Sequence, residues 1–294
     1  MKQIVILSGK GGVGKSSITA SLAVLISKNN SIICADCDVD ASNLALVFGL
    51  NEENFVEWNF ISTNERARIN IEKCVSCKKC VEVCYFNAIK WDETKNKPII
   101  DEFSCEGCGV CKLSCPEGAI NLVKVENAKI GYGKTKFGFD VVSAQLEMGE
   151  SGSGKVVAEV KNFARKKSNN SDYLLVDSAA GVGCPVIASV SGSDYAILVT
   201  EPSPAAFSDL KRALSVVEHF GVPFGIVINK YDLNKEYSEK IEGFAKENHL
   251  NILVKIPYSK SFVKALIDMV PVISFDSKLK GLFEKLAEKV IEKC

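Results

Sequence analysis

The chain of 294 residues has little histidine, no excess of charge of either sign and no long apolar run. Its two histidines, His219 and His249, have no motif around them, which argues against a histidine-based metal site or acid–base pair. The 36 basic and 36 acidic residues cancel, so no net field favours nucleic acid or an anionic membrane, and we expect neither as a partner. No apolar span of about 18 residues occurs, and no small-residue cleavage site follows the first apolar residues. These absences predict a cytoplasmic protein.

Cysteine, by contrast, is abundant, and eight of the twelve cysteines form two matched runs with the spacing C-x2-C-x2-C-x3-C. The runs are Cys74, Cys77, Cys80 and Cys84, and, shifted by 31 residues, Cys105, Cys108, Cys111 and Cys115. A single C-x2-C pair also occurs in zinc knuckles and redox pairs, but two matched runs of four, the second followed by Pro116, argue against both. The spacing is typical of iron–sulfur ligands, which are reduced thiolates, rather than of disulfides. We therefore expect a reducing, anaerobic cytosol.

Outside the cysteine-rich region, apolar runs alternate with amphipathic stretches, which is the pattern of a parallel sheet covered by helices. Strands are predicted at Ile4–Leu7, Ile32–Ala35, Tyr173–Val176, Ala196–Val199, Gly225–Ile228 and Ile252–Val254. Helices are predicted at about Lys15–Lys28, Lys155–Lys166, Ala205–Phe220, Lys235–Glu247 and Ser277–Lys293.

The segment 66–125 breaks this alternation and holds both cysteine runs. Each run is followed by a similar tripeptide, Asn-Ala-Ile at 87–89 and Gly-Ala-Ile at 118–120, so the segment is an internal duplication. We predict a discontinuous domain of residues 1–65 and 126–294. The duplicated segment 66–125 is then a second domain, inserted between the second and third predicted strands.

A glycine-rich loop follows the first predicted strand directly. Its glycines allow backbone N–H groups to wrap phosphates, Lys15 neutralises the outer phosphates, and Ser16 offers a hydroxyl to magnesium at a helix N-terminus. The nucleotide-binding residues that this pattern predicts are Gly9, Lys10, Gly11, Gly12, Val13, Gly14, Lys15, Ser16 and Ser17.

The additional lysine at position 10 makes this the deviant form of the loop, and the chain here resembles the MinD/ParA/Mrp class of P-loop ATPases, which includes the nitrogenase iron protein. The resemblance covers residues 1–65 and 126–294. It implies an α/β fold with a P-loop NTPase parallel sheet flanked by helices, ATP and Mg²⁺ as cofactors, and ATP hydrolysis. In this class the residue that matches Lys10 reaches across a face-to-face dimer to the partner's phosphates. The resemblance therefore implies a homodimer, or a heterodimer with a related chain.

The inserted segment resembles the bacterial two-cluster ferredoxins, which implies a ferredoxin-like α+β domain with two 4Fe-4S clusters. In such proteins three cysteines of a run bind one cluster and the fourth binds the other. The implied ligand sets are Cys74, Cys77, Cys80 and Cys115 for the first cluster, and Cys84, Cys105, Cys108 and Cys111 for the second. Tyr85 replaces the usual proline after the first run, and we expect the cluster to tolerate this. The nearby Lys78, Lys79 and Lys112 either steer an acidic partner or are ordinary solvated lysines.

Two aspartate-bearing segments match the switches of the ATPase class. The resemblance implies that Asp36 lies near magnesium and that Asp38 orients the attacking water, with Asp40 a competing candidate for either role. In the second switch, Asp177 would hold magnesium through water and Gly181 would sense the terminal phosphate. The implied magnesium set is Ser16, Asp36 and Asp177, and the implied catalytic set is Lys10, Lys15 and Asp38.

The strand that ends at residue 228 is followed by an amide and a carboxylate that could read a base, Asn229 and Asp232. Asn229 and Lys230 complete the predicted nucleotide-binding residues. Asn229 and Asp232 resemble the guanine-reading pattern of GTPases, whereas the ATPase class binds adenine through the residue that matches Asn229. We predict ATP as the nucleotide, with GTP as the alternative.

Four cysteines lie outside the two runs. Cys184 follows Asp177 at the offset of a cluster ligand in the nitrogenase iron protein, but the second cysteine that a dimer-bridging cluster needs has no counterpart. It is either a switch or interface thiol, or a small buried residue at the start of a helix, and we favour the buried one. Cys34, Cys37 and Cys294 lack ligand spacing. The apolar stripe of the last helix is either a membrane anchor or a core-facing surface, and its width favours the core.

Three functions are compatible with these features. The first is an ATPase that couples nucleotide turnover to electron transfer through two clusters to a partner redox protein or metallocofactor. The second is an iron–sulfur cluster assembly or carrier ATPase, and the third is a redox-sensing nucleotide switch. We favour the first because the ferredoxin-like cysteines resemble permanent ligands.

Overall fold

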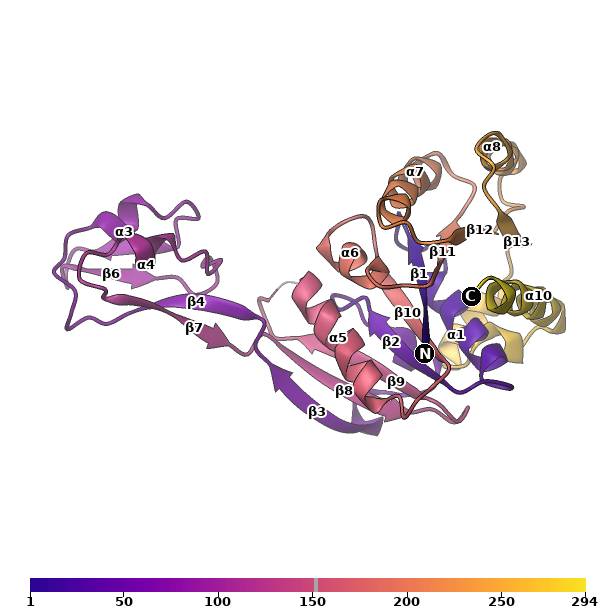
Figure 1. Cartoon of the computed structure of the whole chain (residues 1–294), viewed down its shortest axis with the longest axis horizontal. Helices are drawn as coiled ribbons and strands as arrows, with labels where there is room; N and C mark the ends of the chain where they lie inside the picture. Colours follow the sequence, from indigo (N-terminus) through magenta and orange to yellow (C-terminus); the bar gives the residue numbers. More distant parts are fainter. Residues whose placement is uncertain (151–152) are drawn as a thin grey trace. The chain divides into compact units, whose positions relative to one another are not determined.

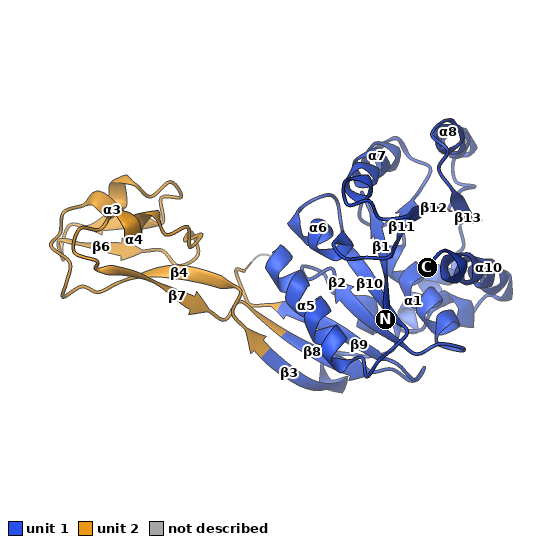
Figure 2. Cartoon of the chain, viewed as in Figure 1, with its two compact units in different colours: residues 1–59, 130–145, 152–294 blue, residues 60–129, 146–151 orange. Residues whose placement is uncertain are grey.

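The computed structural model describes residues 1–150 and 153–294 and divides the chain into two compact units (Figure 2). Unit 1 comprises residues 1–59, 130–145 and 152–294, and unit 2 comprises residues 60–129 and 146–151. The predicted insert 66–125 lies inside unit 2, whose limits extend beyond it at both ends and take in a separate short segment.

Within the described residues, unit 1 is built on a nine-stranded sheet in the order β13-β12-β11-β1-β10-β2-β9-β8-β3 (Figure 1). Its strands are β1 (Lys2–Ser8), β2 (Ile32–Cys37), β3 (Phe55–Ile61), β8 (Ala128–Lys134), β9 (Asp140–Leu146), β10 (Tyr173–Ala180), β11 (Tyr195–Thr200), β12 (Phe224–Asn229) and β13 (Ile252–Ile256). Every neighbouring pair from β13 to β9 is parallel. The prediction of a parallel sheet is therefore confirmed, and each of the six predicted strands lies within an observed one.

Three strands, β3, β8 and β9, were not predicted, and they add an edge beyond β2. The sequence of β8 is interrupted by two glycines, which weakens any strand pattern. Gly131 is required there because a Cβ atom would lie 2.4 Å from the carbonyl oxygen of Glu57 in β3. The backbone that leads into unit 2 consequently leaves from β3 and returns through β8, so the segment 66–125 lies between the second and third predicted strands, β2 and β10, with three further strands beside it.

Helices connect the strands and cover both faces of the sheet (Figure 1). The longer ones are α1 (Lys15–Ile26), α5 (Gly154–Lys167), α7 (Pro204–His219), α8 (Lys235–Glu247) and α10 (Ser277–Lys293). The shorter ones are α2 (Leu44–Val47), α6 (Cys184–Val190), α9 (Ser261–Ile267) and the 3-10 turns η1 (Glu52–Asn54) and η2 (Val272–Ser274). Side chains of Ser153, Ser203, Asn234 and Asp276 cap α5, α7, α8 and α10. These caps satisfy backbone N–H groups that have no partner inside a helix, and so define where each helix begins.

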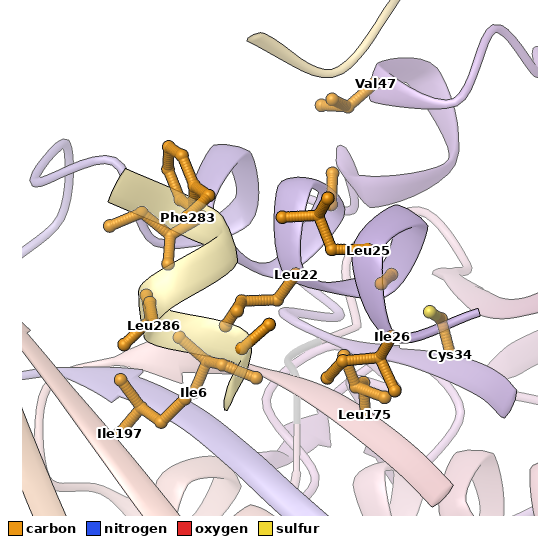
Figure 3. Close-up of a cluster of buried hydrophobic side chains, with 14 of the residues drawn as sticks. Ile6, Leu22, Leu25, Ile26, Cys34, Val47, Leu175, Ile197, Phe283 and Leu286 are labelled. Carbon is orange, nitrogen blue, oxygen red and sulfur yellow. The ribbon is translucent and has the colours of Figure 1, made fainter. Parts of the chain in front are cut away.

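A large apolar core lies between the sheet, α1 and α10 (Figure 3). Alternate residues of a strand face opposite sides, so Ile4 and Ile6 of β1 join this core. Phe283 and Leu286 of α10 are completely buried in it. The apolar stripe of the last helix therefore faces the core, as predicted. None of the helices in residues 1–150 and 153–294 is both long and apolar enough to cross a bilayer.

In the described part of unit 2 there are two antiparallel strand pairs and two short helices. The pairs are β4 (Asn64–Ile69) with β7 (Ile120–Val125) and β5 (Ile89–Asp92) with β6 (Lys97–Ile100). The helices are α3 (Lys79–Glu82) and α4 (Val110–Ser114). The starts of α3 and α4, and those of β5 and β7, are separated by the 31-residue offset of the two cysteine runs. The duplication seen in the sequence is thus a duplication of structure.

Replacing Phe283 with alanine should lower the free energy of unfolding by about 3–5 kcal/mol, because the ring is fully buried and its loss leaves a cavity. Urea unfolding followed by circular dichroism measures this. Phe275→Ala is the matched control, since that ring is 45% exposed and its loss should cost less than about 1 kcal/mol. Equal losses for the two variants would contradict the core assignment of α10.

Candidate nucleotide site and cysteine-lined cavities

The glycine-rich loop joins β1 to α1 at the carboxyl end of the parallel strands. Gly12 and Gly14 adopt left-handed backbone conformations, with φ of 78° and 95°, that are costly for other residues. Gly9 lies so close to α7 that a Cβ atom would be 2.2 Å from the carbonyl oxygen of Asp209. The loop therefore needs glycine for two reasons, backbone conformation and close approach.

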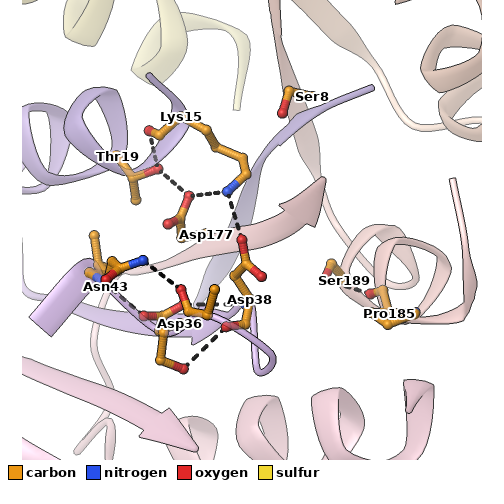
Figure 4. A network of polar contacts seen from close by, with 12 residues as sticks. Ser8, Lys15, Thr19, Asp36, Asp38, Asn43, Asp177, Pro185 and Ser189 are labelled. Carbon is orange, nitrogen blue, oxygen red and sulfur yellow. Dashed lines mark hydrogen bonds and ion pairs between the residues drawn. The ribbon is translucent and has the colours of Figure 1, made fainter. Parts of the chain in front are cut away.

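Lys15 is the central cation of the site and is nearly buried (Figure 4). Its Nζ lies 3.5 Å from Asp177 Oδ1 and 3.6 Å from Asp38 Oδ2. Burial alone would lower the pKa of Lys15, but the charges of Asp177, Asp38 and Asp36 outweigh it and raise the pKa. Thr19, one turn along α1, donates a hydrogen bond of 3.0 Å to Asp177 Oδ1. The structure brings together Lys15 and the three predicted carboxylates.

Asp36 is fully buried at the end of β2, where both of its oxygens accept backbone hydrogen bonds. The amides of Asp38 and Leu44 donate to it at 3.2 Å and 2.9 Å (Figure 4). Burial, followed by the charge of Asp177, raises the pKa of Asp36 to about 8. Asp36 thus holds the turn that follows β2, and its place beside magnesium stays a prediction.

Asp177 lies opposite Asp36 in the parallel register of β10 and β2. Its Oδ1 is used by Thr19 and Lys15, whereas Oδ2 is buried and has no hydrogen-bond partner among the described residues. A buried carboxylate oxygen without a partner is costly, and a divalent cation or its water would satisfy it. This oxygen, with the hydroxyl of Ser16 in the first turn of α1, fits the chemistry that Mg²⁺ prefers.

The competing candidate for the first-switch roles, Asp40, is exposed, whereas Asp38 is half-buried and paired with Lys15. In the second switch, Gly181 is left-handed, with φ of 100°, and its N–H donates to the carbonyl oxygen of Ser8 at 2.9 Å. The switch backbone is thereby joined directly to the start of the phosphate loop.

The side chain of Asn229 is buried and holds the phosphate loop itself. Its Nδ2 donates to the carbonyl oxygen of Val13 at 2.7 Å, and its Oδ1 accepts from the backbone N–H of Lys230 at 3.0 Å. Asp232 accepts from the backbone N–H of Tyr258 at 2.6 Å. Both candidates for base recognition are therefore engaged by the protein, and their reading of a base stays a prediction.

Glu201, which directly follows β11, was not among the predicted site residues. Its Oε1 lies 3.2 Å from the Nζ of Lys10, and its Oε2 lies 2.9 Å from the Nζ of Lys230. The signal that could have found it is its position, since acidic residues at the carboxyl ends of parallel strands share one edge with the phosphate loop.

Two cavities in unit 2 are lined by the two predicted cysteine sets. One is lined by a cysteine set from both runs, Cys74, Cys77, Cys80 and Cys115. The other is lined by the complementary set, Cys84, Cys105, Cys108 and Cys111. Within the described ranges, no three histidine, cysteine, aspartate or glutamate side chains converge on one point as ligands of a single metal ion would. The clusters themselves therefore stay a prediction.

The backbone around the cysteines is arranged in the same way in both halves of unit 2. Left-handed residues recur at the 31-residue offset, with Ser76, Lys78 and Asn87 in the first half and glycines at 107, 109 and 118 in the second. The amide of Ala67 donates to Cys105 Sγ at 3.4 Å, and that of Ala119 donates to Cys115 Sγ at 3.3 Å. Amide donors stabilise thiolate sulfur, so these thiols lie in surroundings suited to metal ligation.

The cysteines outside the runs divide into two kinds. Cys34 and Cys37 are buried in β2, and burial raises the pKa of both thiols. Cys184 is exposed at the start of α6, so our preference for a buried residue there was wrong. The exposed thiol keeps the switch or interface role as the remaining hypothesis. Cys294 is partly buried and packs against the apolar core, and we assign it no switch or interface role.

Comparison with known proteins identifies the family. The model of the "CobQ/CobB/MinD/ParA nucleotide binding domain" matches residues 4–272, and the chain belongs to this family of nucleotide-binding P-loop ATPases. An uncharacterised protein of Methanocaldococcus jannaschii is 38% identical over 291 residues, which are 97% of this chain and 96% of the relative. The iron-sulfur cluster carrier protein of the same organism is 22% identical over 308 residues, covering 99% of this chain and 84% of the relative.

The fold is also similar to the folds of solved structures. The septum site-determining protein MinD from Pyrococcus horikoshii, complexed with Mg-ADP, aligns with a TM-score of 0.61 at 20% identity, covering 98% of this chain and 95% of that one. The predicted MinD/ParA-type nucleotide-binding fold is confirmed. The ferredoxin-like character of the insert and the relation to the nitrogenase iron protein stay predictions.

Asn229→Ala should weaken ATP and GTP binding by the same factor, about tenfold, because it leaves the buried carbonyl of Val13 without its donor and loosens the loop. Titration with fluorescent analogues of both nucleotides measures this. The control is Asn248→Ala, whose exposed amide bonds only to its own helix. A change in the ratio of ATP to GTP affinity would instead show that Asn229 reads the base.

Proposed function

We propose that this chain is a nucleotide-dependent iron–sulfur protein, in which ATP binding and hydrolysis are coupled to electron transfer through two 4Fe-4S clusters. The acceptor is a partner redox protein or metallocofactor. The observation that carries the proposal is the pair of cavities in unit 2, each lined by three cysteines of one run and the last cysteine of the other. Such crossing of ligands is the arrangement of two-cluster ferredoxins.

The apolar content of unit 2 supports this proposal. Its buried cluster consists of Ala67, Ile89 and Ile120 together with Cys80 and Cys111, and other cysteines pack against it. Units with so few buried apolar side chains generally need a metal or disulfides for stability. The cysteines, which carry no disulfide here, would supply that stability as ligands. When bound, the clusters would store and pass single electrons, while Cys77 and Cys108 lie at the protein surface.

The nucleotide half supplies the switch. Lys15 would neutralise the outer phosphates, and the unpartnered Oδ2 of Asp177, with Ser16, would hold magnesium. Asp38, the second carboxylate paired with Lys15, would orient the attacking water. The family resemblance implies a dimer interface at Lys10, whose side chain is 41% exposed in the single chain. We propose a homodimer, or a heterodimer with a related chain, that closes on ATP.

An anaerobic EPR redox titration of the iron-replete protein tests the coupling. We expect Mg-ATP to shift the potential or line shape of a cluster in the wild type and to leave the Lys15→Ala variant unchanged, because Lys15 is buried at the phosphate site. Identical titrations of the wild type with and without Mg-ATP would refute the coupling.

Cys115→Ala should lose the EPR signal of one cluster and leave that of the other, even though Cys115 lies far along the chain from Cys74, Cys77 and Cys80. Cys84→Ala is the matched control, since it should remove the opposite signal. The double variant Cys74→Ala/Cys115→Ala should lose no more than Cys115→Ala alone if both residues serve one cluster. Loss of both signals in the double variant, with one lost in each single variant, would show that the ligands do not cross.

A second candidate, an iron–sulfur cluster carrier, is favoured by the exposed thiol of Cys184 beside the second switch and by the similarity to the carrier protein of M. jannaschii. It predicts transfer of a cluster to an apo-acceptor that depends on ATP and on Cys184. Retention of both clusters through many rounds of ATP hydrolysis, with Cys184→Ser indistinguishable from wild type, would exclude it.

A further inference from the structure

Glu201 joins two lysines at the mouth of the phosphate site. One carboxylate oxygen faces Lys10 at 3.2 Å and the other faces Lys230 at 2.9 Å. The Glu201 side chain is only 17% exposed, so the two ion pairs are partly shielded from water. Burial alone would raise the pKa of Glu201, but the hydrogen bonds and charges of Lys230 and Lys10 lower it, so the carboxylate is charged at neutral pH.

The same group of residues holds the backbone of the loop. Lys230 Nζ also donates to the carbonyl oxygen of Gly12 at 3.1 Å, and Asn229 Nδ2 donates to the carbonyl oxygen of Val13. Lys230 has a left-handed backbone, with φ of 53°, which is unfavourable for lysine and points to a constraint imposed by these contacts. Glu201 is therefore anchored by Lys230, and the anchored carboxylate is what holds Lys10.

We propose that Glu201 is a positioning residue that keeps Lys10 within its own chain until a nucleoside triphosphate enters. This inference rests on the proposed function, in which Lys10 reaches the phosphates bound by a second copy. To reach phosphates bound by a second copy, Lys10 has to turn away from Glu201 of its own chain, so the ion pair with Glu201 opposes that reach. The carboxylate thus sets how readily the chain closes into a dimer.

The electrostatics of the site give the reason for release. Asp177 and Asp38 are paired with Lys15, whereas the ammonium of Lys10 is paired with Glu201. A bound triphosphate brings several negative charges to the loop, and a second copy brings its own lysine. These charges compete with Glu201 for Lys10 and for Lys230, whose Nζ lies at the loop.

The test is a double-mutant cycle with Glu201→Gln and Lys10→Ala. The measurement is the concentration of chain at which half is dimeric with ATPγS, determined by analytical ultracentrifugation. Glutamine keeps the size of the side chain but removes its charge, so Glu201→Gln should lower the half-dimer concentration by up to about fivefold. In the Lys10→Ala background the same substitution should change nothing, because there is no Lys10 to release.

Lys230→Met in the wild-type background separates the effect of the Lys230–Glu201 ion pair from that of the Glu201–Lys10 ion pair. It should act in the same direction as Glu201→Gln but more weakly, since Glu201 keeps its pair with Lys10. An equal effect of Glu201→Gln with and without Lys10, or a weakening of dimerisation with a loss of thermal stability in both backgrounds, would overturn the proposal in favour of a purely structural role. A Lys10→Ala chain that dimerises like the wild type would instead refute the trans-acting lysine of the proposed function.

Discussion

A buried cation surrounded by buried carboxylates at the carboxyl edge of the parallel sheet is the constraint on which the site depends. An isolated charge in such a place would cost several kcal/mol, so Lys15 requires Asp177 and Asp38 as partners. Those partners come from strands that are far apart in sequence but lie next to one another in the order β1-β10-β2. The pairing of these three strands must therefore be preserved whatever is inserted elsewhere.

The position of unit 2 in the chain is compatible with this requirement. The chain enters unit 2 from β3 and returns through β8, two strands at the far edge of the sheet from β13, and β9 then pairs with β2. No strand is added between β1, β10 and β2, so Asp36 and Asp177 remain directly opposite each other. A duplicated cysteine-rich unit is thus carried by the ATPase fold without disturbing the register that assembles its acidic site.

The neighbouring strands on the other side of β1, β11 and β12, contribute a second group of site residues. Glu201 directly follows β11 and Asn229 ends β12, and together with Lys230 their side chains hold the loop and its additional lysine. The central strands assemble the acidic site, while side chains at the ends of β11 and β12 contact Lys10 and the backbone of the loop. Both groups of residues depend on charges that lie where parallel strands end and where water is partly excluded.

Much of this protein followed from local sequence. The loop with its glycines, the two cysteine runs, the six apolar strands and the long amphipathic helices were all recognisable, because phosphate binding, metal-ligand spacing and helix periodicity impose fixed local patterns. The tertiary structure decided what no local pattern records. The strands β3, β8 and β9 have glycines or mixed polarity and exist because neighbouring strands pair with them. The exposure of Cys184, the engagement of Asn229 with the loop and the bridge at Glu201 depend on contacts between residues far apart in the chain. Such contacts are set by strand order, which the sequence of any one segment does not specify.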